Sequence, residues 1–373
     1  MDFSLLFQEI FKGFSAFSLG NALMILVGLV LVALAVIWEF EPVLLLPIGF
    51  GCILANIGMS SDIGLMKIIY DAGIRTELFP LLIFIGVGAM IDFTPLLAMP
   101  QMVLLGAAGQ FGIYGALILA VLLKFPLNEA ASIGVIGAID GPTAIFVTSK
   151  LAPELLGPIA VAAYSYMSLI PIIQPPIMRL LTTKAERRIR MEYAPRVVSR
   201  RARILFPIVV TVVVSLVAPD AAPLIATLML GSLLRESGVV DRLSKAAQNE
   251  IINIATLFLG LAIGSTMTAA SFLNWKTLEI MALGLLAFIL DTVAGLLFGK
   301  LMAALSHGKI NPLIGACGIS AFPMAGRLSA KMAQEEDYEN FILMHAMGSN
   351  TAGQLGSVIA GGLLLALVSG LIK

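Results

Sequence analysis

The chain has 373 residues, of which 59% are hydrophobic and only 12% are charged, against about a quarter charged in soluble proteins. Its mean hydropathy is +1.00, and its formal net charge is zero. A chain this apolar cannot cover its own surface with polar atoms, so lipid must surround much of it. These values exclude a soluble enzyme, and no net charge is available to attract nucleic acid. The composition therefore predicts an all-α polytopic membrane protein.

A helix of about 20 apolar residues crosses the hydrocarbon core of a bilayer. The start, MDFSLLFQEIFKGF, lacks a basic stretch and a small-residue cleavage site, so we expect no removable signal peptide. The predicted spans are 19–38, 42–58, 78–98, 101–123, 155–181, 204–219, 222–236, 252–272, 276–304 and 340–371.

Two further apolar segments, 130–150 and 311–331, have a different pattern. Each contains several glycines and a central proline, in IGAIDGPTAIF and in IGACGISAFPMAGR. Non-helical backbone at membrane depth is tolerated only where protein buries it or where it lines a cavity. Both segments are therefore predicted to be re-entrant or broken helices.

The loop 182–203 is strongly basic and sets the expected orientation. Such a loop stays in the cytoplasm under the positive-inside rule. Counting spans from it places the N-terminus, Lys373 and the residues near Lys150 outside. Its basic residues are Lys184, Arg187, Arg188, Arg190, Arg196, Arg200, Arg201 and Arg203.

The two predicted breaks are related by an internal repeat. Residues 133–152 align without gaps on 314–333, with seven of twenty positions identical. An odd number of crossings separates the two units if the break dips in and returns, so the second unit is expected to be inverted. Inverted repeats with paired broken helices build the ion site of many secondary transporters. An ancient duplication without transport is the alternative.

The repeat suggests a division of the chain into five parts: an N-terminal segment with the first span (1–41), repeat 1 (42–181), the basic loop (182–203), a connecting span (204–222) and repeat 2 (223–373).

Asp140 is the most informative polar residue of the first break. A carboxylate beside Gly141 and Pro142 in an apolar segment costs roughly 2.5–3.5 kcal/mol on insertion scales. Together with carbonyls freed by the break, it would suit Na⁺ or a proton. A carboxylate that merely caps a helix is the alternative.

The second break offers neutral oxygens in place of another charge. Asn311 and Ser320 lie in the break, and Asn350 lies in the following span. Amide and hydroxyl oxygens can bind Na⁺ without adding charge, so a site with one aspartate stays near neutrality. Each of these residues could singly be a helix cap.

Two more residues could carry chemistry. Arg327 is the only arginine in either break, and it would be paired there or hold an anion such as a carboxylate. Its alternative is an orientation signal at the cytoplasmic mouth. Tyr166 could donate a hydrogen bond or a proton, or it could be a packed ring with a satisfied hydroxyl. No Walker loop, HExxH or dinucleotide motif occurs, so Na⁺ is the only metal ion expected.

Four blocks of the sequence resemble those of the beta subunit of biotin-dependent sodium-pumping decarboxylases. They are GAIDGPTAIFVTSKLAP, AAYSYMSLIPIIQPPIMRLLT, NPLIGACGISAFPMAGR and GSNTAGQLGSVIAGG, and the resemblance runs from about residue 20 to the C-terminus. The resemblance implies that Asp140 binds Na⁺ and that Tyr166 is functional. It implies functional roles in the second half for Asn311, Gly315, Ser320, Arg327 and Asn350.

The resemblance also implies a mechanism and partners. A biotin carrier subunit would bring carboxybiotin, whose decarboxylation consumes a proton and drives Na⁺ out of a bacterial cell across its plasma membrane. An elevator-type fold, a beta homotrimer, a carboxyltransferase alpha subunit and a small single-span gamma or delta subunit are implied as well. The absence of long insertions favours an acyl-CoA member, and methylmalonyl-CoA as the parent substrate. From the residues alone, a Na⁺-coupled secondary transporter of a small carboxylate remains open.

Overall fold

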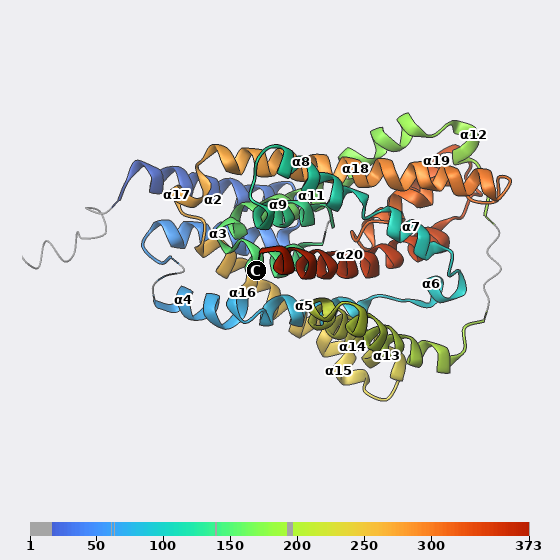
Figure 1. Cartoon of the computed structure of the whole chain (residues 1–373), viewed down its shortest axis with the longest axis horizontal. Helices are drawn as coiled ribbons and strands as arrows, with labels where there is room; N and C mark the ends of the chain where they lie inside the picture. Colours follow the sequence, from blue (N-terminus) through green and yellow to red (C-terminus); the bar gives the residue numbers. More distant parts are fainter. Residues whose placement is uncertain (1–16, 61, 63, 139, 192–196, 373) are drawn as a thin grey trace, which may run out of the picture.

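The described residues form helices and connecting turns (Figure 1). The structure is a computed structural model, and it describes residues 17–60, 62, 64–138, 140–191 and 197–372. The expectations for the extreme N-terminus, Arg196 and Lys373 lie outside these residues. The helices up to the basic loop are α2 (Leu19–Ile37), α3 (Pro42–Asn56), α4 (Gly64–Tyr70), α5 (Leu78–Met90), α6 (Thr94–Ala98), α7 (Met102–Ala108), α8 (Phe111–Leu122), α9 (Leu127–Gly134), α10 (Gly141–Leu151), α11 (Leu156–Leu181) and α12 (Lys184–Arg187).

The second half continues in the same manner. Its helices are α13 (Arg200–Val217), α14 (Ala222–Ser237), α15 (Asp241–Ala246), α16 (Ile252–Ser265), α17 (Ala269–Phe272), α18 (Trp275–Leu305), α19 (Met324–Glu336) and α20 (Leu343–Ile372). Short π-helical turns, η1 (Asp71–Arg75) and η5 (Ala247–Ile251), follow α4 and α15. Further short turns are the 3-10 helices η2 (Val135–Ala138), η3 (Pro153–Leu155), η4 (Pro219–Ala221) and η6 (Pro312–Cys317).

Several helical stretches are long and apolar enough to cross a membrane, which confirms a polytopic α-helical membrane protein. A bent pair, Gly64–Arg75 with Leu78–Met90 at 57°, raises the number among the described residues from six to as many as seven. The six are Leu19–Ile37, Met102–Leu122, Pro153–Leu181, Asp241–Ser265, Trp275–Leu305 and Leu343–Leu371.

The predicted span 78–98 is shorter than expected, because its helix ends at Met90. The Asp92 carboxylate accepts a hydrogen bond from the Thr94 N–H at 2.8 Å, and Pro95 has no N–H to continue the helix. Arg235 donates to the freed Met90 carbonyl at 3.0 Å. Side chains near the helix end thus favour an early stop that apolarity alone does not predict.

Both predicted breaks are broken in the structure, but in different ways. In the first, α9 continues as the 3-10 turn η2, and α10 begins after Asp140. In the second, the 3-10 turn η6 is followed by non-helical residues until α19 begins at Met324. The second break therefore begins with a 3-10 turn, whereas the first break begins with an α-helix.

The order and packing of the helices are alike in the two halves. α3 packs against α2 and α16, whereas α14 packs against α13 and α5. The first helix of repeat 1, α3, thus packs against α16 of repeat 2. The first helix of repeat 2, α14, packs against α5 of repeat 1. Such an exchange of partners is what a two-fold relation between repeats produces, although the inverted orientation itself stays a prediction.

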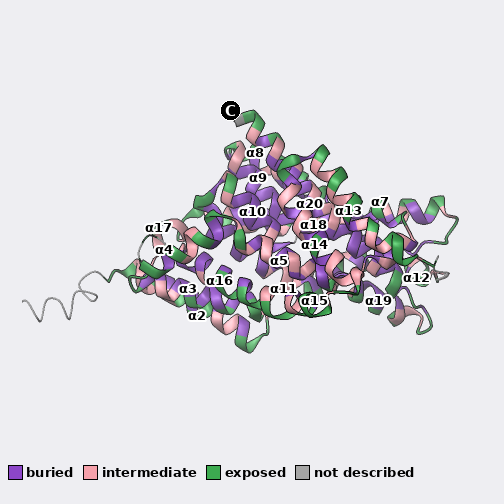
Figure 2. Cartoon of the chain, turned by 90° about the horizontal axis from the view of Figure 1, so that it is seen from below, coloured by how far each residue is buried: buried purple, intermediate pink, exposed green. Residues whose placement is uncertain are grey.

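Buried residues form the middle of the molecule, and exposed residues cover its outside (Figure 2). Much of that outside is apolar: in α13, Leu216 is 78% exposed, and only Pro207 is buried. Large exposed apolar surface needs lipid or a protein partner to cover it. The chain therefore has the surface expected of a membrane protein.

The topology can be tested with single cysteines at the two ends of the molecule. α4 and α17 lie at one end of the long axis, and α6 and α12 lie at the other (Figure 1). Lys150 forms an ion pair at 3.0 Å with Glu77, which lies between η1 and α5, and the predicted topology places both residues outside. We expect Lys150→Cys to react with a membrane-impermeant maleimide in intact cells.

The matched control is Lys309→Cys, an exposed position after α18 on the predicted cytoplasmic side. It should react only after permeabilisation. The native thiols of Cys52 and Cys317 are buried and should give little background. Labelling of Lys150→Cys only after permeabilisation would contradict the inverted-repeat interpretation.

Candidate functional site

The two breaks meet directly inside the molecule. The Ser320 hydroxyl of the second break donates to the Ala138 carbonyl of the first. At the second break, Gly109 and Gly318 lie so close that a Cβ on Gly109 would be 2.0 Å from the Gly318 carbonyl oxygen. The Ser320 hydroxyl thus joins the two breaks, and the absence of side chains lets the connection between α7 and α8 approach the second break closely.

Asp140 lies at this meeting point and caps α10. Its carboxylate accepts hydrogen bonds from the Thr143 hydroxyl at 2.7 Å and from the Gln354 amide at 2.8 Å. The backbone N–H of Thr143 is within 3.4 Å. The side chain is only 6% exposed, so these donors replace water around the charge. The capping role and the ion-binding role weighed from the sequence are therefore compatible.

A cavity of about 310 Å³ opens beside Asp140. Its lining residues come from both breaks, from α5, α11, η5, α16 and α20, and from the N-terminal end of α3. The predicted site residues Asp140, Gly141, Pro142 and Ser320 all line it, together with Gln354. Further polar residues on its walls are Glu41, Tyr164, Gln248, Asn253 and Thr256.

A larger hollow of about 580 Å³ lies between α7, α8 and α18. Its lining is apolar except for Gln110 and Tyr114, and it contains no carboxylate. An ion would lose its water there without gaining ligands of opposite charge. The smaller cavity beside Asp140 is therefore the candidate ion site.

Gly141 makes room for the ring of Tyr164 next to Asp140. A Cβ on Gly141 would lie 2.0 Å from the Tyr164 ring and 2.4 Å from its hydroxyl oxygen. No larger residue fits at this position unless the ring moves. The glycine beside the aspartate thus lets the Tyr164 ring pack against the backbone next to Asp140.

Asn350 is buried beside the second break, although it does not line the cavity. Its amide donates to the carbonyls of Ile319 at 2.7 Å and Cys317 at 3.3 Å. Among the described residues, its Oδ1 has no hydrogen-bond partner. Gln110 donates likewise to the Gly318 carbonyl, and Gln174 to that of Ala316. Side-chain amides therefore hold the freed carbonyls of the break.

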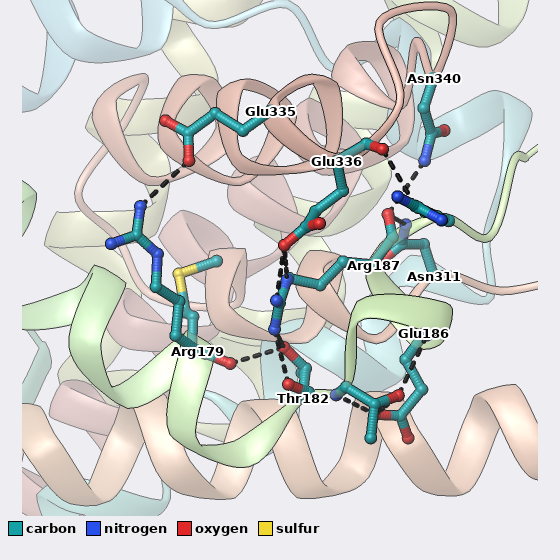
Figure 3. Close-up of polar contacts among 11 residues, drawn as sticks. Arg179, Thr182, Glu186, Arg187, Asn311, Glu335, Glu336 and Asn340 are labelled. Atoms are coloured by element: carbon teal, nitrogen blue, oxygen red, sulfur yellow. Dashed lines mark hydrogen bonds and ion pairs between the residues drawn. The ribbon is translucent and has the colours of Figure 1, made fainter.

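Asn311 lies apart from Asp140, in the contact between the basic loop and the second half (Figure 3). Its amide donates to the carbonyls of Arg187 and Ile189, both at 2.9 Å. Its Oδ1 accepts from the Leu313 N–H at 3.0 Å. The structure thus does not bring this predicted Na⁺ ligand into the Asp140 cavity.

Arg187 is the centre of that loop contact, and its guanidinium is only 8% exposed (Figure 3). It pairs with Glu336 at 2.6 Å and donates to the Thr182 carbonyl. Asn340, like Asn311, donates to the Arg187 carbonyl. We name Arg187, Glu336, Asn311 and Asn340 the loop clamp, because they join the basic loop to η6 and to the C-terminal end of α19.

The two predicted catalytic residues lie outside the cavity lining. Arg327 is exposed on α19, and its guanidinium has no partner among the described residues. The Tyr166 hydroxyl donates to the Met281 carbonyl of α18. Gly315 packs against the backbone of Gly295 and Gly299 in α18. Of the predicted site residues, the cavity therefore brings together Asp140, Gly141, Pro142 and Ser320. Its lining does not include Tyr166, Asn311, Gly315, Arg327 or Asn350.

Gln354 and Tyr164 are site residues that the sequence analysis missed. Gln354 follows Asn350 by four residues on α20, so the two side chains share one helix face. That spacing was a usable signal. Tyr164 precedes Tyr166 by two residues, and the sequence has no feature that tells which of the two faces Asp140.

A polytopic helical protein whose two broken segments meet at a buried carboxylate belongs to the broad class of membrane ion-handling proteins. The family model of the Na⁺-transporting oxaloacetate decarboxylase beta subunit matches residues 20–368. The chain is 55% identical over 362 residues to the glutaconyl-CoA decarboxylase subunit beta of Acidaminococcus fermentans, covering 96% of each chain.

Other relatives carry different substrate names. The chain is 55% identical over 359 residues to the methylmalonyl-CoA decarboxylase subunit beta of Veillonella parvula, covering 96% of each chain. It is 47% identical over 413 aligned positions to the oxaloacetate decarboxylase beta chain of Klebsiella pneumoniae, covering 94% of this chain and 95% of that one.

The chain belongs to the family of Na⁺-transporting decarboxylase beta subunits. It is thus a multi-pass membrane subunit of a biotin-dependent decarboxylase complex, the class of complex that includes alpha and biotin carrier subunits. This confirms the family predicted from the four sequence blocks.

The loop clamp leads to a prediction about the basic loop. The Arg187 hydrogen bond lowers the pKa of Glu336, so the clamp is present at neutral pH and is lost as the pH falls through that lowered pKa. In inside-out vesicles, Arg187→Ala should increase tryptic cleavage of the loop 182–203 several-fold at neutral pH.

Arg179→Ala serves as the matched control. Arg179 forms an ion pair with Glu335, and the two side chains are 61% and 44% exposed, respectively. Exposed pairs contribute little, so its cleavage rate should stay near that of the wild type. Equal cleavage of the wild type and Arg187→Ala would show that the clamp does not hold the loop.

Proposed function

We propose that the chain decarboxylates carboxybiotin carried on a partner subunit and couples this step to Na⁺ export, with consumption of a proton. The observation that carries the proposal is the buried Asp140 carboxylate, which lines a cavity where two broken helices meet. Membership of the decarboxylase family supports the pump over a Na⁺-coupled carboxylate transporter, which would share the ion site.

In this proposal Asp140 supplies the one charge that balances Na⁺. Ser320 lines the same cavity and offers a hydroxyl oxygen. The unpaired Asn350 Oδ1 is available as a neutral ligand next to the second break. Asn311, at the start of the second broken segment, is proposed as a ligand nearer the basic loop and apart from Asp140. Gly141, Pro142 and Gly315 give the backbone its shape at the site.

Arg327 is proposed to hold the carboxylate of carboxybiotin. Its guanidinium is exposed and has no partner among the described residues, and it can bind a carboxylate through two parallel hydrogen bonds. A Na⁺ ion that reaches hydroxyl oxygens favours their deprotonation. The released proton, from Tyr166 or Ser320, would then pass to the biotin ring nitrogen as CO2 leaves.

The wider assembly is proposed from the family. The two repeats would form an inverted, elevator-type transporter in a bacterial plasma membrane. The chain would act as a homotrimer with a carboxyltransferase alpha subunit, a biotin carrier and a small single-span gamma or delta subunit. The apolar exposed face of α13 supports a lipid or helix partner.

For the parent substrate, we propose an acyl-CoA, and methylmalonyl-CoA in particular. The two relatives at 55% identity carry acyl-CoA names, but they are divided between glutaconyl-CoA and methylmalonyl-CoA. Assaying the purified complex with both thioesters and with oxaloacetate tests this choice. Turnover of oxaloacetate alone would contradict it.

The sodium site is tested by Asp140→Asn. This change removes the balancing charge while keeping the size of the side chain, so Na⁺-dependent decarboxylation should be lost while the complex stays assembled. Asn350→Ala removes one neutral ligand of several and should only raise the Na⁺ concentration required. The measurement is decarboxylation against Na⁺ concentration in reconstituted vesicles. Normal Na⁺ dependence of Asp140→Asn would place the site elsewhere.

The coupling step is tested by Arg327→Lys and Tyr166→Phe. Lysine cannot reproduce the two parallel hydrogen bonds of a guanidinium, so Arg327→Lys should slow carboxybiotin decarboxylation and leave Na⁺ binding intact. Tyr166→Phe should slow turnover and shift its pH dependence. An unchanged pH profile of Tyr166→Phe would make Tyr166 a packing residue, consistent with its hydrogen bond to Met281.

A further inference from the structure

The connection between α7 and α8 is a part of the molecule that the proposed function does not use. Gly109 and Gln110 interrupt the helix there, within the apolar span Met102–Leu122. Neither residue lines the cavity beside Asp140. We name residues 109–113 the link turn, because their backbone and side chains contact both breaks.

Gln110 holds the backbone next to two residues of the cavity. Its Nε2 donates to the Gly318 carbonyl at 3.1 Å and to the Gly353 carbonyl at 3.3 Å. Gly318 comes two residues before Ser320, and Gly353 directly precedes Gln354. Ser320 and Gln354 both line the cavity. A single buried amide on the link turn therefore ties the second break to α20 behind the cavity.

The link turn also packs against the first break. A Cβ on Gly137 would lie 2.9 Å from the backbone nitrogen of Ile113 and 3.0 Å from the carbonyl carbon of Gly112. Gly137 directly precedes Ala138, whose carbonyl accepts the hydrogen bond from Ser320. The link turn thus reaches the backbone beside the point where the two breaks are joined.

Asp291 holds the link turn from α18. Its side chain is fully buried near the middle of that helix, and its Oδ1 accepts from the Gly112 N–H. This N–H is among the first of α8, which have no partner within their own helix. A Cβ on Gly112 would be 2.6 Å from the Asp291 carboxyl carbon. An acidic residue at this depth is costly and marks a functional position.

We propose that Gln110 and Asp291 are positioning residues, which act through the link turn to hold the two breaks in the arrangement that binds Na⁺. Neither side chain contacts the ion in this proposal. It rests on the proposed function, because it takes the cavity beside Asp140 to be the Na⁺ site. A ligand binds more weakly when the arrangement that accepts it is only partly populated. Loss of either residue therefore weakens Na⁺ binding, and saturating Na⁺ restores the arrangement.

The test is decarboxylation against Na⁺ concentration in reconstituted vesicles of Gln110→Met and Asp291→Ala. Both changes remove the hydrogen bonds to the link turn or to its partners. Each should raise the Na⁺ concentration for half-maximal activity about tenfold, which corresponds to about 1.4 kcal/mol, and leave kcat at saturating Na⁺ close to that of the wild type. A role in fold stability alone would lower activity at every Na⁺ concentration and leave the half-maximal concentration unchanged.

Asp291→Asn is the conservative variant, because the amide keeps an oxygen that accepts from the Gly112 N–H. Its Na⁺ requirement should stay close to that of the wild type. Gln101→Met is the matched control for Gln110→Met, since Gln101 is exposed before α7 and does not line the cavity. It should leave the Na⁺ requirement unchanged.

The Na⁺ concentration that half-maximally raises the melting temperature of the purified complex gives a second readout, which needs no turnover. It should shift in the same variants by the same factor. Melting curves without Na⁺ show whether each variant folds, and Gln110→Met provides the result if Asp291→Ala does not fold.

The outcomes distinguish the two proposals. Wild-type Na⁺ requirements in Gln110→Met and Asp291→Ala, with activity lost in Asp140→Asn, would overturn the positioning proposal and leave the proposed function intact. Equal impairment of Asp291→Asn and Asp291→Ala would overturn the positioning role of Asp291, because the acceptor oxygen would not be what matters. Normal Na⁺ dependence of Asp140→Asn would instead overturn the site on which both proposals depend.

Discussion

Backbone groups freed inside a membrane protein must find partners within the protein, because lipid offers none. This constraint organises the centre of the molecule. The Ala138 carbonyl of the first break is held by Ser320, and the carbonyls of Cys317 and Ile319 are held by Asn350. Close glycine contacts let the remaining backbone approach without side chains. The position of the Asp140 carboxylate follows from this network.

The sequence predicts the elements of this centre better than their contacts. Glycine and proline in an apolar stretch identify both breaks, and the cost of burying Asp140 singles out the carboxylate that lines the cavity between them. Asn311 could not be placed, because its partners are the carbonyls of Arg187 and Ile189 in a loop more than 100 residues away. Apolarity likewise does not show that the helix before Asp92 ends early, since side-chain hydrogen bonds decide that end.

The loop clamp and the cavity lie at different ends of the second broken segment. Arg187 and Asn311 hold the start of η6, whereas Ser320 follows its last turn and reaches the cavity. A movement of the basic loop would therefore pull on the same short stretch of backbone that carries the cavity residues. Helices from both halves of the chain line the cavity, so a movement of one half against the other would change its shape.

The hydrogen bond between Gln354 and Asp140 joins residues 214 positions apart. Ser320, which holds the first break, comes 182 positions after Ala138. During synthesis the first broken helix therefore enters the membrane long before its partners exist. Its carbonyl and carboxylate must be shielded by water or by the insertion machinery until the second half arrives, so the cavity beside Asp140 is among the last parts of the molecule to form.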